Sequence, residues 1–418
     1  MSVKKSAATS FVLITVLIDS IGFGVIIPVI PRLISELAHV DTSGAARYGG
    51  WLFAAYSVMQ FIFSPIMGGL SDQYGRRPVL LASLFGFALD YLLLVFASSI
   101  GWLFVGRIIA GIMGASFTTA AAYMADISTP EKRAQNFGMI GAAFGLGFIV
   151  GPIIGGFVSE LGTRAPFMVA GGLTILNWLY GYFVLPESLS MENRRKFNWK
   201  RANPIGALTN LRRFPMIVGL VTALFLVYIS SFSTQGTWAY YTKEKFGWSE
   251  REVGLSLTFI GVMIALVQGF LTRILVPKLG TRKSIYIGFI FSILGSLAYC
   301  FANEGWMVYA IMVPFSLGGL AGPAMQGLIS GQIPANEQGE LQGSLTSLNS
   351  VSAIIGPVLM SSLFAKFTAK GAPIYFPGVP FLASVILTTI SLLLIVRTLN
   401  KHTTKVEQAE AIKHSGIS

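Results

Sequence analysis

The chain has 418 residues, of which 53% are hydrophobic and only 11% are charged, with a formal net charge of +12. Soluble domains carry about 25% charged residues, so this composition excludes an ordinary soluble protein and indicates a chain that lies mostly in a lipid bilayer. The basic residues occupy short segments between apolar runs rather than one face of a domain, which argues against nucleic acid as a partner.

Apolar runs long enough to cross a bilayer recur along the whole sequence. A membrane-spanning helix needs about 20 apolar residues and satisfies its backbone hydrogen bonds internally. The runs lack the alternation of apolar and polar residues that is typical of a membrane barrel. We therefore predict an all-α membrane protein with twelve transmembrane helices. The expected spans are residues 9–31, 48–70, 78–98, 101–126, 134–158, 165–185, 214–240, 251–276, 283–302, 305–332, 339–365 and 377–398.

The sequence also predicts two homologous halves of six helices each. Glycine landmarks of the first half recur in the second at a nearly constant offset, for example Gly75 as Gly280 and Gly138 as Gly343. Two parallel repeats around a site near the bilayer midplane are common among secondary transporters. The expected domains are an N-terminal half at residues 1–185, a basic cytoplasmic linker loop at 186–213, a C-terminal half at 214–398 and a cytoplasmic tail at 399–418.

Lysine and arginine residues set the expected orientation of the chain in the membrane. With the N-terminus in the cytoplasm, most of the 30 Lys and Arg residues fall in cytoplasmic loops, the linker loop above all. The positive-inside rule selects this orientation. We expect a multi-pass protein of the cell inner membrane with both termini in the cytoplasm.

Three charged residues lie deep inside predicted spans, away from the span ends, and all are in the first half: Asp19, Asp90 and Arg107. Each costs roughly 2.5 to 3.5 kcal/mol to insert, so each is a candidate for function. An aspartate that alternates between burial and the vicinity of Arg107 could bind and release a proton, as proton coupling requires. A static ion pair that only fixes helix packing is the alternative. The second half offers neutral polar candidates, Gln268 and Gln326.

The loop after the second predicted span reads Gly-Leu-Ser-Asp-Gln-Tyr-Gly-Arg-Arg-Pro at residues 69–78. The two guanidinium groups of Arg76 and Arg77 can reach carboxylates on neighbouring helices. This loop resembles the motif between helices two and three of the major facilitator superfamily. The resemblance implies the major facilitator fold and a conformational latch, in which Asp72, Arg76 and Asp126 hold the halves in the outward-open state. Two ordinary arginines of a cytoplasmic loop are the alternative.

The fifth predicted span is rich in small residues. Glycines at helical spacing let two membrane helices approach closely, and a proline lets a helix bend. The pattern resembles the antiporter motif that exporters of the same superfamily carry in this helix, and generic small-residue packing is the alternative. The residues concerned are Gly147, Gly151, Pro152, Gly155 and Gly156.

The segments around the intramembrane charges narrow the resemblance. They read Asp-Ser-Ile-Gly-Phe-Gly from Asp19, Ala-Leu-Asp-Tyr-Leu-Leu around Asp90, Gly-Arg-Ile-Ile-Ala-Gly around Arg107 and Pro-Ala-Met-Gln-Gly around Gln326. These segments resemble the twelve-helix tetracycline/proton antiporters, over about residues 11–398. The resemblance implies electroneutral exchange of a metal-chelated tetracycline for a proton. It also places the three charges with Gln268 and Gln326 in the central cavity or the coupling path.

The chain departs from that family at two positions. Ile264 and Ser292 stand where those antiporters carry a histidine in helix eight and an aspartate in helix nine. Both of those residues are tied to proton coupling in the family. Any coupling in this chain must therefore rest on Asp19 and Asp90.

Aromatic residues offer a second set of candidates for the cavity wall. Tyr56, Tyr91, Trp238 and Tyr241 could line an amphipathic drug cavity, or form interfacial belts and helix contacts. Trp238 and Tyr241 lie near the predicted edge of the membrane. For these two residues we expect the belt.

The function expected from these features is export of a small amphipathic molecule in exchange for protons, with no bound cofactor or metal and with the monomer as the working unit. Export of an endogenous metabolite or siderophore, or uptake by the same fold, are alternatives because related folds serve both directions. An ATP-driven pump would need a phosphate-binding Gly-x-x-x-x-Gly-Lys-Ser/Thr loop, and metal or nucleophile catalysis a His/Cys cluster. The sequence has neither, so we expect a transporter and not an enzyme.

Overall fold

The computed structural model describes residues 2–114, 116–197, 199, 206, 218–333 and 337–414. Parts of the predicted linker loop and of the predicted tail lie outside these ranges, namely residues 198, 200–205, 207–213 and 415–418. The domain boundaries expected there remain a prediction.

Twelve helices of the described residues are long and apolar enough to cross a membrane, which confirms the expected all-α architecture. No strand occurs within the described ranges. The spans are Ala8–Ala38, Thr42–Tyr74, Arg76–Phe96, Ile100–Ile127, Gln135–Leu161, Ala165–Val184, Val218–Gln235, Glu250–Leu279, Thr281–Phe301, Gly305–Ser330, Leu341–Thr368 and Val379–Asn400.

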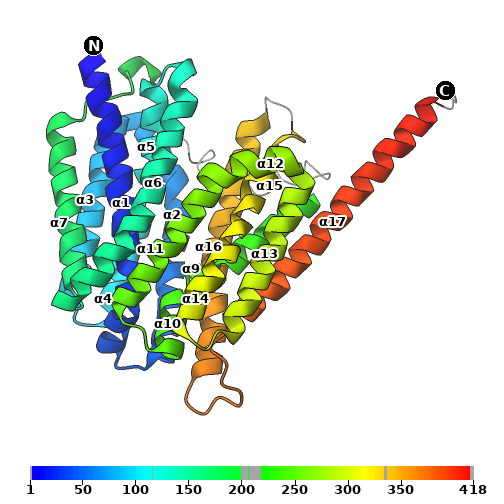
Figure 1. The fold of residues 1–418 in the computed structure, drawn as a ribbon. Helices are drawn as coiled ribbons and strands as arrows, with labels where there is room; N and C mark the ends of the chain where they lie inside the picture. Colours follow the sequence, from blue (N-terminus) through cyan, green and yellow to red (C-terminus); the bar gives the residue numbers. More distant parts are fainter. Residues whose placement is uncertain are drawn as a thin grey trace.

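The helices form two bundles that lie side by side (Figure 1). We call α1–α7 the first half and α9–α17 the second half. The helices of the first half are α1 (Ser2–Ala38), α2 (Thr42–Tyr74), α3 (Arg76–Phe96), α4 (Ile100–Met113), α5 (Ser116–Ile127), α6 (Pro130–Val158) and α7 (Ala165–Val184). Those of the second half are α9 (Val218–Gln235), α10 (Trp238–Phe246), α11 (Glu250–Leu266), α12 (Thr272–Leu279), α13 (Thr281–Phe301), α14 (Gly305–Ser316), α15 (Ala321–Ser330), α16 (Gln338–Thr368) and α17 (Val379–His414).

The same turn ends the second span of each half, which gives the predicted repeat a physical basis. Gly75 separates α2 from α3 with φ of 106°, and Gly280 separates α12 from α13 with φ of 79°. Positive φ favours glycine because the residue has no Cβ. The glycine landmarks of the repeat therefore mark two equivalent helix-to-helix turns.

Both termini lie at one end of the molecule, which we call the proximal end, and the opposite end we call the distal end (Figure 1). The halves meet at the distal end through two helix pairs, α2 with α16 and α6 with α11. Hydrogen bonds cross this contact, among them one from Ser43 Oγ to the Ala365 carbonyl at 3.2 Å and one from Thr258 Oγ1 to the Ile149 carbonyl at 3.0 Å.

Glycines allow the halves to approach closely at the distal end. A methyl group on Gly254 of α11 would lie 2.3 Å from the Pro152 carbonyl oxygen of α6. One on Gly50 of α2 would lie 1.8 Å from Ser361 Oγ of α16. Toward the proximal end, by contrast, Gly141 of α6 has open space where its methyl group would be. The halves are therefore closed on each other distally, and their ribbons diverge toward the proximal end (Figure 1).

The predicted seventh span, residues 214–240, is interrupted. Its helix α9 ends at Gln235, and α10 begins at Trp238 after a turn at Gly236. The turn directs the aromatic side chains of α10 into the second half: Trp238 is 3% exposed and Tyr241 is 0% exposed. Both pack against the ring of Phe381. The expectation that Trp238 and Tyr241 form an interfacial belt is therefore wrong.

Candidate functional site

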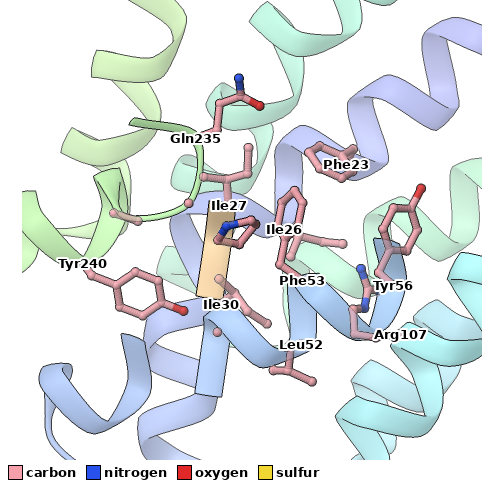
Figure 2. Close-up of a pocket in the computed structure, with 14 residues that line it drawn as sticks. Phe23, Ile26, Ile27, Ile30, Leu52, Phe53, Tyr56, Arg107, Gln235 and Tyr240 are labelled. Atoms are coloured by element: carbon pink, nitrogen blue, oxygen red, sulfur yellow. The ribbon is translucent and has the colours of Figure 1, made fainter. Parts of the chain in front are cut away.

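A pocket lies between the two halves, on the proximal side of their distal contact, and we call it the central pocket (Figure 2). Helices α1, α2 and α4 of the first half and α9, α10 and α16 of the second contribute to its wall. The wall is mostly apolar, with a few polar side chains, as is usual for sites that bind small molecules. The lining residues are Phe23, Ile26, Ile27, Ile30, Gly49, Leu52, Phe53, Tyr56, Arg107, Gln235, Gly236, Ala239, Tyr240 and Pro357.

An ion pair stands at the edge of this pocket. Arg107 of α4 borders the pocket and donates from Nη2 to Asp90 Oδ2 of α3. Asp90 is only 1% exposed. The structure thus joins two of the three intramembrane charges that the sequence singled out, and it places one of them directly on the pocket wall.

The ion pair is incompletely satisfied by the protein. Asp90 Oδ1 and Arg107 Nε are buried, and neither has a hydrogen-bond partner among the described residues. A methyl group on Gly106 would lie 2.6 Å from Asp90 Oδ1, so this glycine leaves room for the carboxylate. Buried charges usually carry a full set of hydrogen bonds, and exceptions concentrate at functional sites.

Asp19 of α1 belongs to the same group of charges. It lies partly buried, and its charge acts on Tyr56 and Tyr91 together with those of Asp90 and Arg107. We call Asp19, Asp90 and Arg107 the charge cluster. All three charges therefore lie within electrostatic range of Tyr56, which lines the central pocket. Their part in proton coupling remains a prediction.

Two features around the charge cluster escaped the sequence analysis. Gly22, one turn after Asp19, leaves room for Tyr91, because a methyl group there would lie 1.9 Å from the Tyr91 hydroxyl. Gln60 donates to the Tyr56 hydroxyl at 3.2 Å. The helical spacing of Gly22 from Asp19 could have indicated the first feature. Only the fold reveals the second.

The two glutamines predicted for the cavity do not line the central pocket. Gln268 lies in a π-helical turn, Val267–Leu271, and is exposed. Gln326 of α15 is also exposed and donates to Gln342 Oε1 at 3.3 Å. The polar groups that the second half brings to the pocket are instead Gln235 and Tyr240.

The sequence contains a pattern that could have indicated Gln235 as a pocket residue. It ends the run Ser-Ser-Phe-Ser-Thr-Gln at residues 230–235, inside an otherwise apolar span. Tyr240 has no comparable signal, because it is one of two adjacent tyrosines in the predicted membrane-edge segment. At the positions of the family's coupling residues, Ile264 is partly exposed on α11, and the Ser292 hydroxyl packs against Gly318.

The predicted latch residues meet at the proximal end of the first half. Arg76 Nη1 donates to Asp72 Oδ1 at 2.5 Å and to Ser71 Oγ at 2.5 Å, and its Nε donates to Asp126 Oδ2 at 3.2 Å. All of these partners belong to the first half. The geometry of the three residues is as expected from the motif, whereas their role in latching the two halves remains a prediction.

Glu187, directly after α7, organises the same loop and was not singled out from the sequence. Its carboxylate accepts hydrogen bonds from the backbone N–H groups of Arg76 at 2.8 Å and Arg77 at 3.2 Å. A carboxylate at this place also compensates the positive end of the α3 dipole. The Arg77 guanidinium donates to the Tyr182 carbonyl at 2.7 Å, so Arg77 binds a backbone oxygen rather than a carboxylate.

The glycines of the fifth span lie on two contacts of α6. Three of them, at four-residue spacing, face backbone carbonyls of α1 at the same spacing, and a fourth faces α11 of the other half. A methyl group on Gly147 would lie 2.7 Å from the Leu17 carbonyl oxygen, and one on Gly151 would lie 2.5 Å from that of Ile21. A methyl group on Gly155 would lie 2.5 Å from the Val25 carbonyl oxygen, and one on Gly156 would lie 2.8 Å from that of Glu250. Pro152 lies between them, with its ring 2.8 Å from the Cβ position of Gly24. The close approach is as predicted, and the antiporter role remains a prediction.

Comparison with known proteins identifies the family. The sequence profile described as Major Facilitator Superfamily matches residues 12–357 and 220–416. The chain is 36% identical to tetracycline resistance protein class C of Escherichia coli over 387 residues, which cover 91% of this chain and 97% of the relative. It is 34% identical to the class B protein of the same organism, covering 93% and 96%. The chain belongs to the Major Facilitator Superfamily.

A solved structure of another protein has the same fold. The chain superposes with a TM-score of 0.74 on a bacterial homologue of the human lysosomal transporter Spinster, at 16% identity, covering 94% of this chain and 97% of the other. Members of the Major Facilitator Superfamily carry small molecules across membranes between two such halves. The chain is therefore a multi-pass membrane transporter of this superfamily, and the central pocket is its candidate substrate site.

Proposed function

We propose that this protein exports amphipathic small molecules, tetracyclines among them, across the cell inner membrane in exchange for protons. The observation that carries the proposal is the buried Asp90–Arg107 ion pair, in which Arg107 lines a mostly apolar pocket between the halves. The tetracycline resistance relatives support export of this class of compound. With both termini in the cytoplasm, the distal end faces outward, and the structure is closed to the outside.

The charge balance of the cluster explains how exchange works. The cluster holds two carboxylates and one guanidinium, so one negative charge is in excess when all three residues are ionised. Net negative charge inside a membrane protein is costly. A proton on one aspartate, or a cationic substrate such as a magnesium chelate of tetracycline, lowers this excess of negative charge. A proton and a cationic substrate therefore compete for the cluster, and this competition couples export of the substrate to entry of the proton.

Arg107 links protonation of Asp90 to the wall of the central pocket. Its guanidinium is held by Asp90 and at the same time borders the space where a substrate lies. A proton on Asp90 removes the charge that makes this hydrogen bond strong. The pocket wall therefore changes when the proton arrives, which favours release of the substrate at the outer side.

The test measures proton flux in everted membrane vesicles energised by respiration. Adding tetracycline with Mg²⁺ to vesicles that contain the wild-type protein should release protons from the lumen. Asp19→Asn and Asp90→Asn should abolish this flux, because neither can take up a proton. Asp41→Asn is the matched control: Asp41 caps α2 by accepting from the Gly44 N–H at 2.9 Å, and asparagine caps helices equally well.

Two outcomes would contradict the proposal in different ways. Full proton flux in both charge-cluster variants would show that coupling runs elsewhere. The wild type could release no protons with tetracycline but release them with a siderophore or a cell metabolite. That result would show a different substrate and would still support proton antiport. Accumulation of the compound in intact cells would indicate uptake instead.

A further inference from the structure

The distal end of the central pocket holds a buried polar group that the proposed mechanism does not use. Tyr240 of α10 is 3% exposed, and its ring is part of the pocket lining. Its hydroxyl has no hydrogen-bond partner among the described residues. Figure 2 shows this hydroxyl pointing from α10 into the group of lining side chains, toward Ile30.

An unpaired buried hydroxyl is unfavourable unless something else bonds to it. Leaving a buried donor unsatisfied costs about 1 to 3 kcal/mol. Two other buried tyrosines avoid that cost: the Tyr241 hydroxyl donates to the Tyr299 carbonyl at 2.6 Å, and the Tyr123 hydroxyl donates to the Pro186 carbonyl at 2.7 Å. Tyr240 is adjacent to Tyr241 in the sequence, yet only its hydroxyl faces the pocket.

The opposite half leaves room for this hydroxyl. A methyl group on Gly49 of α2 would lie 2.0 Å from the Tyr240 hydroxyl oxygen. Glycine at this position therefore allows the phenol to occupy the junction of the two halves. The neighbouring lining residues, Ile30 and Leu52, are apolar and offer no hydrogen bond to it.

We propose that Tyr240 is the hydrogen-bond donor with which the second half recognises the substrate, and that it selects molecules with an acceptor oxygen. This inference rests on the proposed function and deepens it. The substrate class is an amphipathic ring compound with a cationic or metal-chelating group toward the charge cluster. At its other end the compound carries a carbonyl or hydroxyl oxygen, which accepts from Tyr240. Lipophilic cations without such an oxygen gain no hydrogen bond from the Tyr240 hydroxyl.

The test compares two tyrosine variants in the full-length protein, purified and placed in lipid nanodiscs. The probes are tetracycline with Mg²⁺, which carries acceptor oxygens, and ethidium, a flat aromatic cation without oxygen. Tyr240→Phe should weaken tetracycline binding about three- to tenfold, the range expected for one neutral hydrogen bond. It should leave ethidium binding unchanged, and it should not lower the unfolding temperature, because the hydroxyl has no protein partner to lose.

Tyr241→Phe is the matched control for burial and residue type. It removes a hydroxyl that bonds to the Tyr299 carbonyl, so the unfolding temperature should fall. The ratio of tetracycline affinity to ethidium affinity should stay as in the wild type. The two variants therefore separate loss of a substrate contact from loss of a structural contact.

Three results would overturn the proposal. Equal tetracycline binding by Tyr240→Phe and the wild type would sink the donor role while leaving the proposed function intact. An equal loss for both probes would show that Tyr240 only shapes the pocket. A wild type that binds no tetracycline would remove the proposed substrate class, and the role of Tyr240 with it.

Discussion

At the scale of single residues, the charge cluster combines stability with function. Asp90 is buried and relies on Arg107 for its hydrogen-bonded counterion. Breaking a buried ion pair by removing one partner typically costs about 3 to 5 kcal/mol, because the other charge stays buried and uncompensated. Replacing both partners by neutral groups avoids that penalty. Removing one member of the pair should therefore lower the stability of the protein as well as its transport activity.

The first prediction concerns this pair. Arg107→Gln should destabilise the protein by about 3 to 5 kcal/mol, because it leaves the Asp90 carboxylate without its partner. The double variant Asp90→Asn with Arg107→Gln should recover part of that loss. Thermal unfolding in nanodiscs measures both. A double variant less stable than Arg107→Gln alone would show that the two side chains do not stabilise each other.

At the scale of elements, short-range backbone contacts position the helices that carry the site. The helix α6 approaches α1 through carbonyl oxygens that glycines leave uncovered, and α1 carries Asp19 and Phe23. A side chain at these glycines would separate the helices, since the contacting atoms are backbone and cannot rotate away. The start of α3 depends similarly on the Glu187 carboxylate.

The second prediction tests the contact of α6 with α1. Gly151→Ala places a methyl group 2.5 Å from the Ile21 carbonyl oxygen, so it should displace α1 and reduce both stability and transport. Gly141→Ala, on the same helix but in open space, is the control and should unfold at the wild-type temperature or above it. Equal behaviour of the two variants would argue against a packing role for Gly151.

The third prediction tests the cap of α3. Glu187→Gln should lower the stability by about 0.5 to 2 kcal/mol, because a neutral amide compensates the helix dipole and the two N–H groups less well. Glu192→Gln changes an exposed residue of the same segment and should have no effect. Equal unfolding temperatures for the Glu187 variant and the wild type would show that the Glu187 carboxylate does not stabilise the start of α3.

At the scale of the whole molecule, close packing, hydrogen bonds and ion pairs hold the two halves together at the distal end. Arg251 of α11 pairs with Glu160 of the first half at 3.3 Å, and Gly254 lies one turn further along α11. Transport by alternating access requires this contact to open. Substitutions that loosen it should shift the population toward the state that is open distally.

The fourth prediction measures this shift. Gly254→Ala cannot fit 2.3 Å from the Pro152 carbonyl oxygen, so the distal ends should move apart. Spin labels at the exposed positions 47 and 370, in a Cys300→Ser background, report the distance between the halves by double electron–electron resonance. We expect a longer mean distance than in the wild type. Gly269→Ala, where a methyl group meets no neighbour, is the control, and an unchanged distance in Gly254→Ala would contradict the prediction.

The sequence by itself determined the twelve spans, the two-fold repeat and the identity of the intramembrane charges. These features depend on the length of apolar runs and on residue type, which are local properties. It also indicated the Asp72, Arg76 and Asp126 group, because a loop motif places two of its three members close together. From the second half, Gln235 and Tyr240 line the central pocket, whereas the predicted Gln268 and Gln326 do not. A place for these two glutamines in the coupling path remains a prediction.

Only the tertiary structure decided which polar side chains face the central pocket and at which end the halves are closed. Whether a side chain faces the pocket depends on how its helix is rotated about its axis and on which helices lie next to it. Neither is a local property of the sequence. Tyr240 and Tyr241 show why. Successive residues of a helix point about 100° apart, so one hydroxyl reaches the pocket and the other reaches the Tyr299 carbonyl. Two identical neighbours in the sequence thus acquire different roles from packing alone.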